Sequence, residues 1–207
     1  MRGNKEPGCP SETFSWPFRF RSPCTDTPMR LFTALDIPDA LREQIAALRT
    51  PDALDARWTP PKQYHITLRF IGEVDSETAS EYDDALDTVT VPEAECTPYG
   101  LDVLPSRRNP SVLIVGLDRT DALLSVYRAV SDALEDAGLD PESRTYRPHV
   151  TLARLDDCAP ETVHRYLQKH DASDLPAFTA PQFHLYESTL TPDGAVHERR
   201  ASYALHR

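Results

Sequence analysis

The sequence predicts a mixed α and β fold in which one strand–helix–strand–helix unit occurs twice. Three observations lead to this prediction. Segments with the alternation of a strand and segments with the spacing of a helix follow one another along the chain. The pattern His, Ile or Val, Thr, Leu begins at His65 and again at His149. The 207 residues suffice for one substantial core or for two small lobes that share a cleft.

The first unit follows the start of the expected folded region. Residues 31–35 form a short apolar run, and Pro38 is well placed as the first residue of a helix. Residues 64–70 alternate between apolar and polar side chains as a half-buried strand does, and Gly72 closes them. Ser76 is a suitable N-cap for a second helix. The residues expected on the buried faces of these helices are Leu41, Ile45, Leu48, Ala79, Tyr82, Leu86 and Val89.

The second unit has the same order of elements. Residues 112–115 form an apolar strand and are followed by a long amphipathic helix that stops at Gly138. A strand is expected over residues 149–152, and Pro160 opens the next helix. The long helix is expected to bury Leu123, Tyr127, Val130 and Leu134.

The two ends of the chain lie outside the repeated units. Residues 1–28 are rich in proline and show no period, so a disordered extension is expected there, with residues 29–207 as a single domain. An alternative is a small docking tail built on Phe14, Trp16, Phe18 and Phe20. Near the other end, residues 183–190 and 196–205 are expected to form a hairpin around a turn at 191–194.

Composition argues against several classes of function. The chain has 33 acidic and 22 basic side chains and a net charge of −11, unlike a protein that binds by coating a nucleic-acid backbone. A phosphate-bearing substrate fits if positive charge is gathered locally. No stretch approaches the roughly 18 consecutive apolar residues of a membrane helix, so no membrane partner is expected. The scattered cysteines fit a reducing cytoplasm better than a disulfide scaffold: Cys9, Cys24, Cys96 and Cys158.

The repeat extends beyond the two histidines. They lie 84 residues apart, and twelve residues after each comes Glu-Thr at the start of a predicted helix, at 77–78 and 161–162. Upstream, Leu-Asp pairs at 35–36 and 117–118 end the preceding strands, offset by 82 residues. Two copies of one unit usually pack about a pseudo-twofold axis. We therefore expect the two His-x-Thr sequences, called here the H-x-T triplets, to face each other.

The triplets carry groups suited to the cleavage of a phosphodiester. Alternation along a strand places the histidine and the threonine of each triplet on one face, roughly 6–7 Å apart. Two imidazoles across a cleft can serve as general base and general acid, since the ordinary pKa of histidine is about 6.5. Two threonine hydroxyls can hold an anionic, tetrahedral group. The candidate catalytic residues are His65 and His149, and the candidate substrate-binding residues are Thr67 and Thr151.

The sequence resembles the 2H phosphoesterase superfamily, which is named for two H-x-T motifs, and within it the RNA 2′,3′-cyclic phosphodiesterases, also called 2′-5′ RNA ligase-like proteins. The matching segments are MRLFTALDIP at 29–38, HITLRFIGEV at 65–74, RPHVTLAR at 147–154 and FHLYES at 183–188. The match runs from Met29 almost to the end of the chain.

The resemblance implies an α+β fold of two pseudo-symmetric lobes, each an antiparallel sheet flanked by helices, with the active-site cleft between them. It implies that a 2′,3′-cyclic phosphate at an RNA end is opened to a 2′-phosphate without a metal or cofactor. Reversible 2′-5′ RNA ligation is compatible with the same resemblance. By resemblance, His65 is the proton donor and His149 the acceptor, Thr67 and Thr151 bind phosphate oxygens, and Arg154 adds positive charge. The expected protein is a cytoplasmic monomer that acts on RNA ends, with tRNA fragments among them.

Strict alternation conflicts with part of this assignment. It places Arg154 on the face opposite His149 unless the strand ends or bulges after Leu152. By the same parity, Arg69 shares the face of His65 and is a rival phosphate contact. Alternation also directs Phe32 inward and Thr33 toward the cleft, which puts the stacking of a base in doubt.

For the other polar residues the sequence does not single out one role. Tyr186 is expected either to line the cleft or to belong to the core. The loop at 107–109 is expected to be solvated or to contact an RNA backbone. The remaining histidines, which show no metal-ligand spacing, are expected to be structural or at the surface: His164, His170, His184, His197 and His206.

Three other functions stay open at this point. One is a phosphodiesterase that acts on a small cyclic phosphate, such as a nucleotide or an ADP-ribose derivative. Another is a non-catalytic module that binds RNA ends, although binding alone does not need a proton-transfer pair. The third is a zinc hydrolase that uses His65 and His149, for which a third ligand at fixed spacing is missing.

Overall fold

The computed structural model describes residues 28–170, 172–191 and 194–206. The extension expected over residues 1–28 therefore lies, except for its last residue, outside the described residues, as do the aromatic residues of the alternative docking tail. The helices are α1 (Asp39–Ala47), α2 (Ser76–Asp87), α3 (Asp121–Asp136) and α4 (Pro160–Lys169), with short 3₁₀ turns η1 (Pro51–Ala53) and η2 (Pro61–Gln63). The strands are β1 (Met29–Asp36), β2 (Ala56–Trp58), β3 (His65–Val74), β4 (Ala94–Cys96), β5 (Pro98–Ser106), β6 (Asn109–Leu117), β7 (His149–Leu155), β8 (Phe178–Ala180), β9 (Gln182–Thr191) and β10 (Gly194–Ala204).

Two antiparallel half-sheets meet at a narrow seam. The strand order is β10-β9-β1-β3-β7-β6-β5, and β2 pairs with β7. β3 and β7 share one register pair, Ile66 with Val150, whereas β1 and β3 share eight. The seam is also bridged by Tyr146, whose hydroxyl donates to the carbonyl of Thr67 at 3.2 Å. The two halves thus correspond to the two expected lobes.

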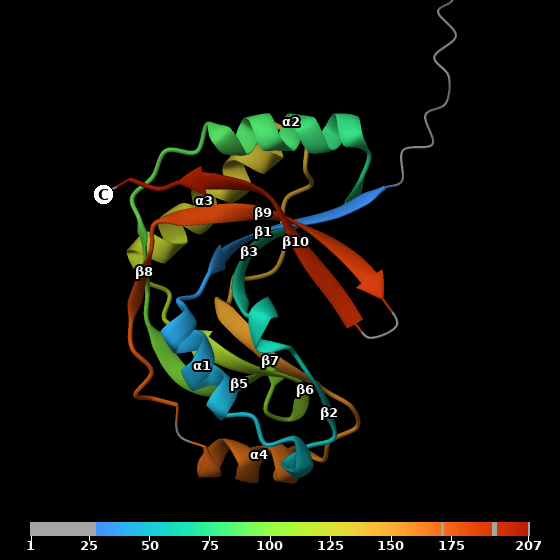
Figure 1. Ribbon diagram of the computed structural model, residues 1–207, viewed down its shortest axis with the longest axis vertical. Helices are drawn as coiled ribbons and strands as arrows, with labels where there is room; N and C mark the ends of the chain where they lie inside the picture. Colours follow the sequence, from blue (N-terminus) through green and yellow to red (C-terminus); the bar gives the residue numbers. More distant parts are fainter. Residues whose placement is uncertain (1–27, 171, 192–193, 207) are drawn as a thin grey trace, which may run out of the picture.

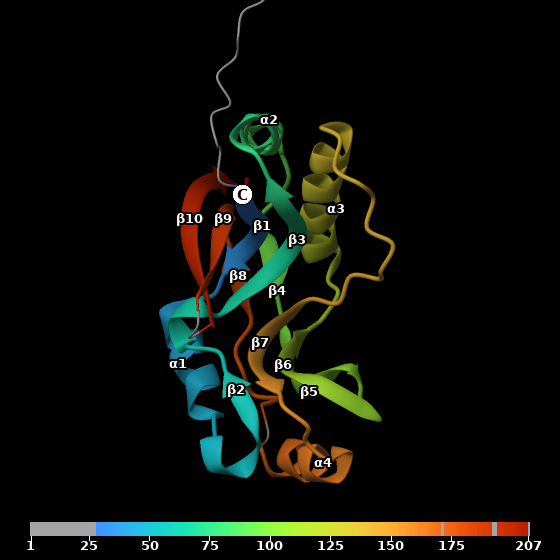
Figure 2. The same cartoon turned by 90° about the vertical axis from the view of Figure 1, so that its right-hand side faces the viewer.

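The helices cover the two halves separately. Figures 1 and 2 show α2 and α3 over the half formed by β1, β3, β9 and β10, while α1 and α4 lie with the other half. The first helix of each unit, α1 or α3, thus lies against the half built by the other unit. The expected α+β fold with two pseudo-symmetric halves is confirmed.

The helical faces bury the residues that their spacing predicted. Leu41, Ile45, Leu86, Leu123 and Leu134 are all buried in the core. Among the other expected residues, Tyr82, Val89 and Val130 are buried, whereas Leu48, Ala79 and Tyr127 are partly buried.

Two helix starts differ by one residue from the prediction. The side chain of Asp75, not of Ser76, caps α2 by accepting a hydrogen bond from the backbone N–H of Thr78 at 2.9 Å. Pro38 precedes α1 as its N-cap residue instead of opening it. Gly138 follows α3 with φ +102°, a conformation that favours glycine, as expected.

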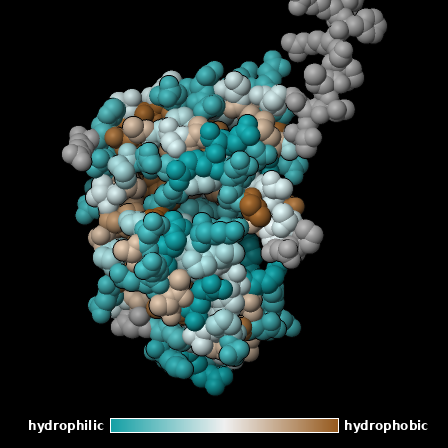
Figure 3. Space-filling model, viewed as in Figure 1, coloured by the Kyte–Doolittle hydropathy of each residue, from teal (hydrophilic) through white to brown (hydrophobic). Residues whose placement is uncertain are grey.

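The C-terminal hairpin is present as β9 and β10, with Thr191 paired to Gly194. Residues 192 and 193 lie outside the described part of the chain. Alternation did not predict β2, β4, β5 or β8. The surface in Figure 3 is mainly hydrophilic, in keeping with the 27% of charged residues.

Candidate active site

The two H-x-T triplets lie side by side at the seam of the sheet. Ile66 and Val150 are direct partners, and both are buried. Because the strands are antiparallel, this register places His65 opposite Thr151 and His149 opposite Thr67. Directly opposed residues of an antiparallel pair have Cα atoms about 4.5–5.5 Å apart. Four half-buried polar side chains therefore gather on one face, here called the site face: His65, Thr67, His149 and Thr151.

Each imidazole is oriented by a backbone carbonyl two residues earlier. The Nδ1 atom of His65 is 2.7 Å from the carbonyl oxygen of Gln63, and that of His149 is 2.7 Å from the carbonyl oxygen of Arg147. Because a carbonyl only accepts, Nδ1 carries the proton in both rings. The Nε2 atom is then the one that exchanges protons. In His65 it lies 3.2 Å from Oγ1 of Thr67.

Both strands bulge one residue after the threonine. Leu68 in β3 and Leu152 in β7 are the extra residues in pairing with β1 and β6. The two strands consequently share one burial pattern over seven residues: partly buried, buried, partly buried, buried, buried, exposed, buried. A bulge shifts the alternation by one. Arg69 and Ala153 therefore face the core, whereas Phe70 and Arg154 return to the site face.

The bulge overturns the expectation that Arg69 is a rival phosphate contact. Its side chain is only 4% exposed and lies on the core side of β3. It contacts the carboxylate of Glu135 at 3.3 Å and the carbonyl oxygen of Asp140, so it ties β3 to α3 and the loop behind it. This arginine is structural.

The same bulge places Arg154 on the face of His149. It is exposed between two buried neighbours, and no ion pair or hydrogen bond joins its side chain to any residue that the structure describes. Its direct partner in β2 is Arg57, whose side chain is 76% exposed and pairs with Asp156 at 3.2 Å. Two arginines thus lie side by side next to the second triplet, and Asp156 compensates the charge of one of them, although the chain as a whole is acidic.

An aromatic cluster surrounds His65. The expectation that Phe32 points to the core and Thr33 to the cleft is wrong, because Asp36 pairs with His65 and fixes the opposite parity along β1. Thr33 is fully buried on the core side and is hydrogen-bonded to the backbone of Arg69. Phe32 lies with its ring centroid 5.0 Å from that of His65. Its ring also approaches Tyr186 at 5.3 Å, His197 at 4.9 Å and the 62% exposed Phe70 at 6.1 Å.

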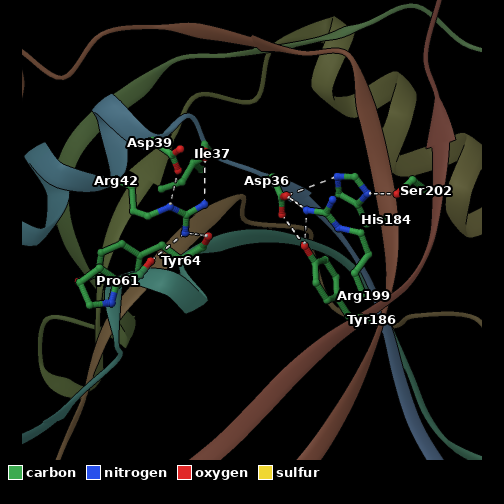
Figure 4. A network of polar contacts seen from close by, with 10 residues as sticks. All are labelled: Asp36, Ile37, Asp39, Arg42, Pro61, Tyr64, His184, Tyr186, Arg199 and Ser202. Carbon is green, nitrogen blue, oxygen red and sulfur yellow. Dashed lines mark hydrogen bonds and ion pairs between the residues drawn. The ribbon is translucent and has the colours of Figure 1, made fainter.

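A polar network supports this cluster at the end of β1. The hydroxyl of Tyr186 donates to Asp36 at 2.6 Å, and Arg199 contacts the same carboxylate, as Figure 4 shows. His184 is fully buried, with Nε2 3.6 Å from Asp36 and Nδ1 2.9 Å from the hydroxyl of Ser202. Tyr186, for which two roles were open, therefore lies on the site face. His184, expected to be structural or at the surface, is buried beneath this network.

Burial lowers the pKa values of both candidate catalytic histidines. The pKa of His65 falls to about 4, chiefly because its ring is desolvated, and the nearby His197 and His149 lower it further. The Gln63 carbonyl and the Asp36 carboxylate oppose this shift. The pKa of His149 is also lowered, first by burial. Both rings are therefore neutral at pH 7 until an anion binds beside them.

Among the residues that the structure describes, no group of three or more His, Cys, Asp or Glu side chains is arranged to hold a metal ion. The same part of the chain contains no helix long and apolar enough to cross a membrane. Cys96 and Cys158 are free thiols.

Three residues of the site face escaped the sequence reasoning. Phe70 and Asp36 are found through the register of β1 with β3. His197, expected to be structural or at the surface, lies with its ring 5.4 Å from that of His65. The upstream part of the repeat is also displaced: the residue opposite His149 is Gly116, so Asp36 corresponds to Gly116 and not to Asp118. The loop expected at 107–109 is a turn of Arg107 and Arg108 between β5 and β6, and Asn109 already begins β6.

Comparison with known proteins identifies the family. The LigT-like phosphoesterase family model matches the chain twice, over residues 35–114 and 115–197. The chain belongs to this family. Each match contains one H-x-T triplet, so the internal repeat is also a repeat of the family unit.

Named relatives cover most of the chain. The RNA 2′,3′-cyclic phosphodiesterase of Methanocaldococcus jannaschii is 31% identical over 173 residues, which are 82% of this chain and 97% of that protein. The enzyme of the same name from Archaeoglobus fulgidus is 26% identical over 82% of this chain and 97% of its own.

Solved structures share the fold. Escherichia coli LigT complexed with 3′-AMP superposes with a TM-score of 0.70 at 22% identity and covers 87% of this chain and 100% of that one. A protein from Thermus thermophilus gives a TM-score of 0.72 at 22% identity, with 85% and 97% covered.

Proposed function

We propose that this chain, a cyclic phosphodiesterase of the LigT-like family, hydrolyses the 2′,3′-cyclic phosphate at RNA ends to a 2′-phosphate. The single observation that carries the proposal is the seam of β3 and β7. There, two imidazoles with protonated Nδ1 atoms present Nε2 beside two threonine hydroxyls. The reaction needs no metal ion in this account, because both proton transfers are assigned to the histidines.

The proposed reaction is an in-line attack by water on phosphorus. His149 accepts a proton at Nε2 from the attacking water, and the new P–O bond forms as the bond from phosphorus to the 3′ oxygen breaks. His65 gives the proton on its Nε2 atom to that 3′ oxygen. The products are a 3′ hydroxyl and a 2′-phosphomonoester, and the two histidines then exchange their protons with solvent. The order of donor and acceptor follows the resemblance described above.

The remaining groups hold the phosphate. The hydroxyls of Thr67 and Thr151 can each donate to one phosphate oxygen. The guanidinium of Arg154, which has no ion pair or hydrogen bond with the described residues, supplies positive charge on the same face. A bound phosphate anion favours the protonated form of one nearby imidazole. This effect gives His65 the proton that the free protein lacks at pH 7.

An RNA chain fits this surface better than a mononucleotide does. Arg57 lies directly opposite Arg154 and is largely exposed; its Nε atom pairs with Asp156, and the rest of its guanidinium can contact a second anion farther from the triplets. Phosphates further along an oligonucleotide can contact it. RNA ends, tRNA fragments among them, are therefore the proposed partners. Reversible 2′-5′ ligation, a monomeric state and a cytoplasmic location belong to the same proposal.

One assay tests the proposed function. The full chain is incubated with an oligonucleotide that ends in a 2′,3′-cyclic phosphate, with and without EDTA, and the product is identified by ³¹P NMR. We expect a 2′-phosphate at equal rates in both samples and a higher kcat/KM than with a nucleoside 2′,3′-cyclic phosphate. Loss of activity in EDTA would contradict metal independence, and a preference for the mononucleotide would favour a small substrate. Binding without turnover would indicate an RNA-end-binding module.

The active unit is proposed to be residues 29–207. Removal of residues 1–28 should then leave kcat/KM unchanged within about twofold, since the family match begins after them. A larger loss would show that the extension contributes to the site or to the fold.

A further inference from the structure

The hairpin of β9 and β10 brings a third imidazole against His65. His197 lies on β10, outside both H-x-T triplets. Its ring centroid is 5.4 Å from that of His65 with an interplanar angle of 88°, and 4.9 Å from that of Phe32 at 75°. His197 thus stands edge-to-face against both His65 and Phe32, whose own rings are inclined at 36° to each other, and these contacts restrict the rotation of all three rings.

A second contact ties the same stretch of β10 to His65. The side-chain amide of Gln63 donates from Nε2 to the carbonyl oxygen of Ala195 at 2.7 Å. The carbonyl of Gln63 in turn accepts the hydrogen bond from Nδ1 of His65 at 2.7 Å. One residue therefore holds both the imidazole of His65 and the strand that carries His197.

His149 has a different environment. Its Nδ1 atom is held by Arg147, whose guanidinium pairs with Asp102 at 3.7 Å instead of contacting the hairpin. Within the described part of the chain, no aromatic ring stacks on His149. Contact with a third histidine is thus a feature of the His65 side alone.

The charges around the two rings favour a single proton. Protonated His197 and His149 disfavour a proton on His65, whereas Asp36 favours one. Burial and Arg30 disfavour a proton on His197, whose Nδ1 atom is buried without a hydrogen-bond partner in the described residues. Two imidazolium charges this close repel each other, so a proton on one ring disfavours a proton on the other. Tyr186 also faces His65, and burial raises the pKa of its phenol, which is therefore neutral in this range.

We propose that His197 is a positioning residue for His65: its ring fixes the plane of the His65 imidazole, and its charge limits the two rings to one proton at a time. The inference rests on the proposed function, because it takes His65 to be a proton-transfer group. It predicts that the charge of His197 competes with the catalytic proton as the pH falls. It also predicts that the hairpin, remote in sequence, tunes only one of the two triplets.

The test is an NMR titration of the histidine rings in the free full-length chain, together with the pH dependence of kcat/KM. His197→Phe keeps a ring and removes the charge, whereas His197→Ala removes both. His164→Phe, at an exposed position on α4, is the matched control. We expect His197→Phe to raise the titration midpoint of His65 by about 0.5–1 pH unit and to move the acidic limb of kcat/KM the same way. His164→Phe should move neither.

The alanine variant separates the ring from the charge. His197→Ala should raise the His65 midpoint similarly and should also lower kcat by about 3–10-fold, because the imidazole plane is no longer held. If the phenylalanine variant does not fold, His197→Gln replaces it as the uncharged variant. An unmoved His65 midpoint in the folded uncharged variant would overturn the inference, whatever the activity. Because the titration uses no substrate, a shifted midpoint in a protein that does not open the cyclic phosphate would refute the proposed function and not the coupling.

Discussion

His65 and His149 stand on strands that match in burial, bulge and ring orientation, yet the residues around them differ at three corresponding positions. On the site face, β1 places Asp36 opposite His65, and β6 places Gly116 opposite His149. An added Cβ at Gly116 would come within 2.1 Å of the ring of Tyr99, so this aromatic ring lies over the glycine. A carboxylate thus stands beside one histidine, and a tyrosine covers the position beside the other.

The other two differences concern the substrate side. Phe32 on β1 corresponds to Val112 on β6, and Phe70 after the first bulge corresponds to Arg154 after the second. At this position the His65 half therefore offers the exposed ring of Phe70, and the His149 half offers the exposed guanidinium of Arg154. We expect the shared backbone to supply the pair of proton-transfer groups, and the divergent side chains to separate a base-binding side from a phosphate-binding side. Each of the following predictions tests this division.

Removal of either imidazole should have the largest effect. His65→Ala or His149→Ala should each lower kcat/KM by about 10²–10⁴-fold, because one proton transfer is lost. The double variant should be little worse than either single one, since the two groups act as a unit. A substrate with sulfur in place of the 3′ oxygen, a better leaving group, should restore activity to His65→Ala and not to His149→Ala. Rescue of the opposite variant would reverse the roles, and near-normal activity of either variant would end the acid–base account.

Removal of a threonine hydroxyl should lower kcat/KM less than removal of an imidazole does, and by a similar factor in the two triplets. Thr67→Ala and Thr151→Ala each remove one hydrogen bond to a charged group, worth about 1.5–3 kcal/mol, or roughly ten- to hundredfold in kcat/KM. Steady-state kinetics on the cyclic-phosphate oligonucleotide measure both. Replacement by serine should retain most of the activity. An effect confined to one triplet would show that the phosphate is not held between them.

Phe70 and Arg154 should separate base binding from phosphate binding. Phe70→Ala should raise KM about 5–30-fold for a nucleotide and leave a substrate without a base unaffected, because base–aromatic stacking is lost. Arg154→Ala should weaken both substrates by about tenfold and lower the salt dependence of binding. Equal effects of Phe70→Ala on substrates with and without a base would refute the assignment of base stacking to Phe70.

Arg57 should matter only for a longer substrate. Arg57→Ala should lower kcat/KM by about 3–10-fold for an oligonucleotide and leave a nucleoside cyclic phosphate unchanged, since one exposed charge contacts one remote phosphate. Arg144→Ala, which removes an exposed arginine from the loop before β7, is the control. Equal losses on both substrates would place Arg57 in the phosphate site itself.

The repeat made most of the fold and the candidate site predictable from the sequence. Two copies of a strand–helix unit with matched spacing were enough to bring both triplets together, since equivalent positions meet at the seam. Strict alternation failed at the bulges, because an extra residue in a strand leaves no glycine or proline as a marker. One signal was present: Leu152 and Ala153 are adjacent apolar residues that break the alternation of β7. If the same break is assumed at the corresponding residues of the first copy, Leu68 and Arg69, it directs Arg69 toward the core.

The contact of His197 with His65 could not be predicted from the sequence for a different reason. It lies on β10, outside the repeat, and it meets His65 only because β9 and β10 join the sheet next to β1. Residues from strands that are distant in the chain come together through the sheet order, which spacing within a unit does not reveal. The sequence likewise did not show which side chains of β1 point to the site face, since this depends on the pairing of Asp36 with His65.

The pH dependence of kcat/KM tests the acid–base pair most directly, since it reports the ionisations of the free protein. Burial lowers the pKa values of both histidines below their ordinary 6.5, to about 4 for His65. The productive form carries one proton on the pair, so activity should fall as the pH rises through the upper pKa and as it drops through the lower one. The account predicts a bell-shaped curve with its maximum below pH 6.5. A curve that is flat, or that still rises above pH 7, would contradict it.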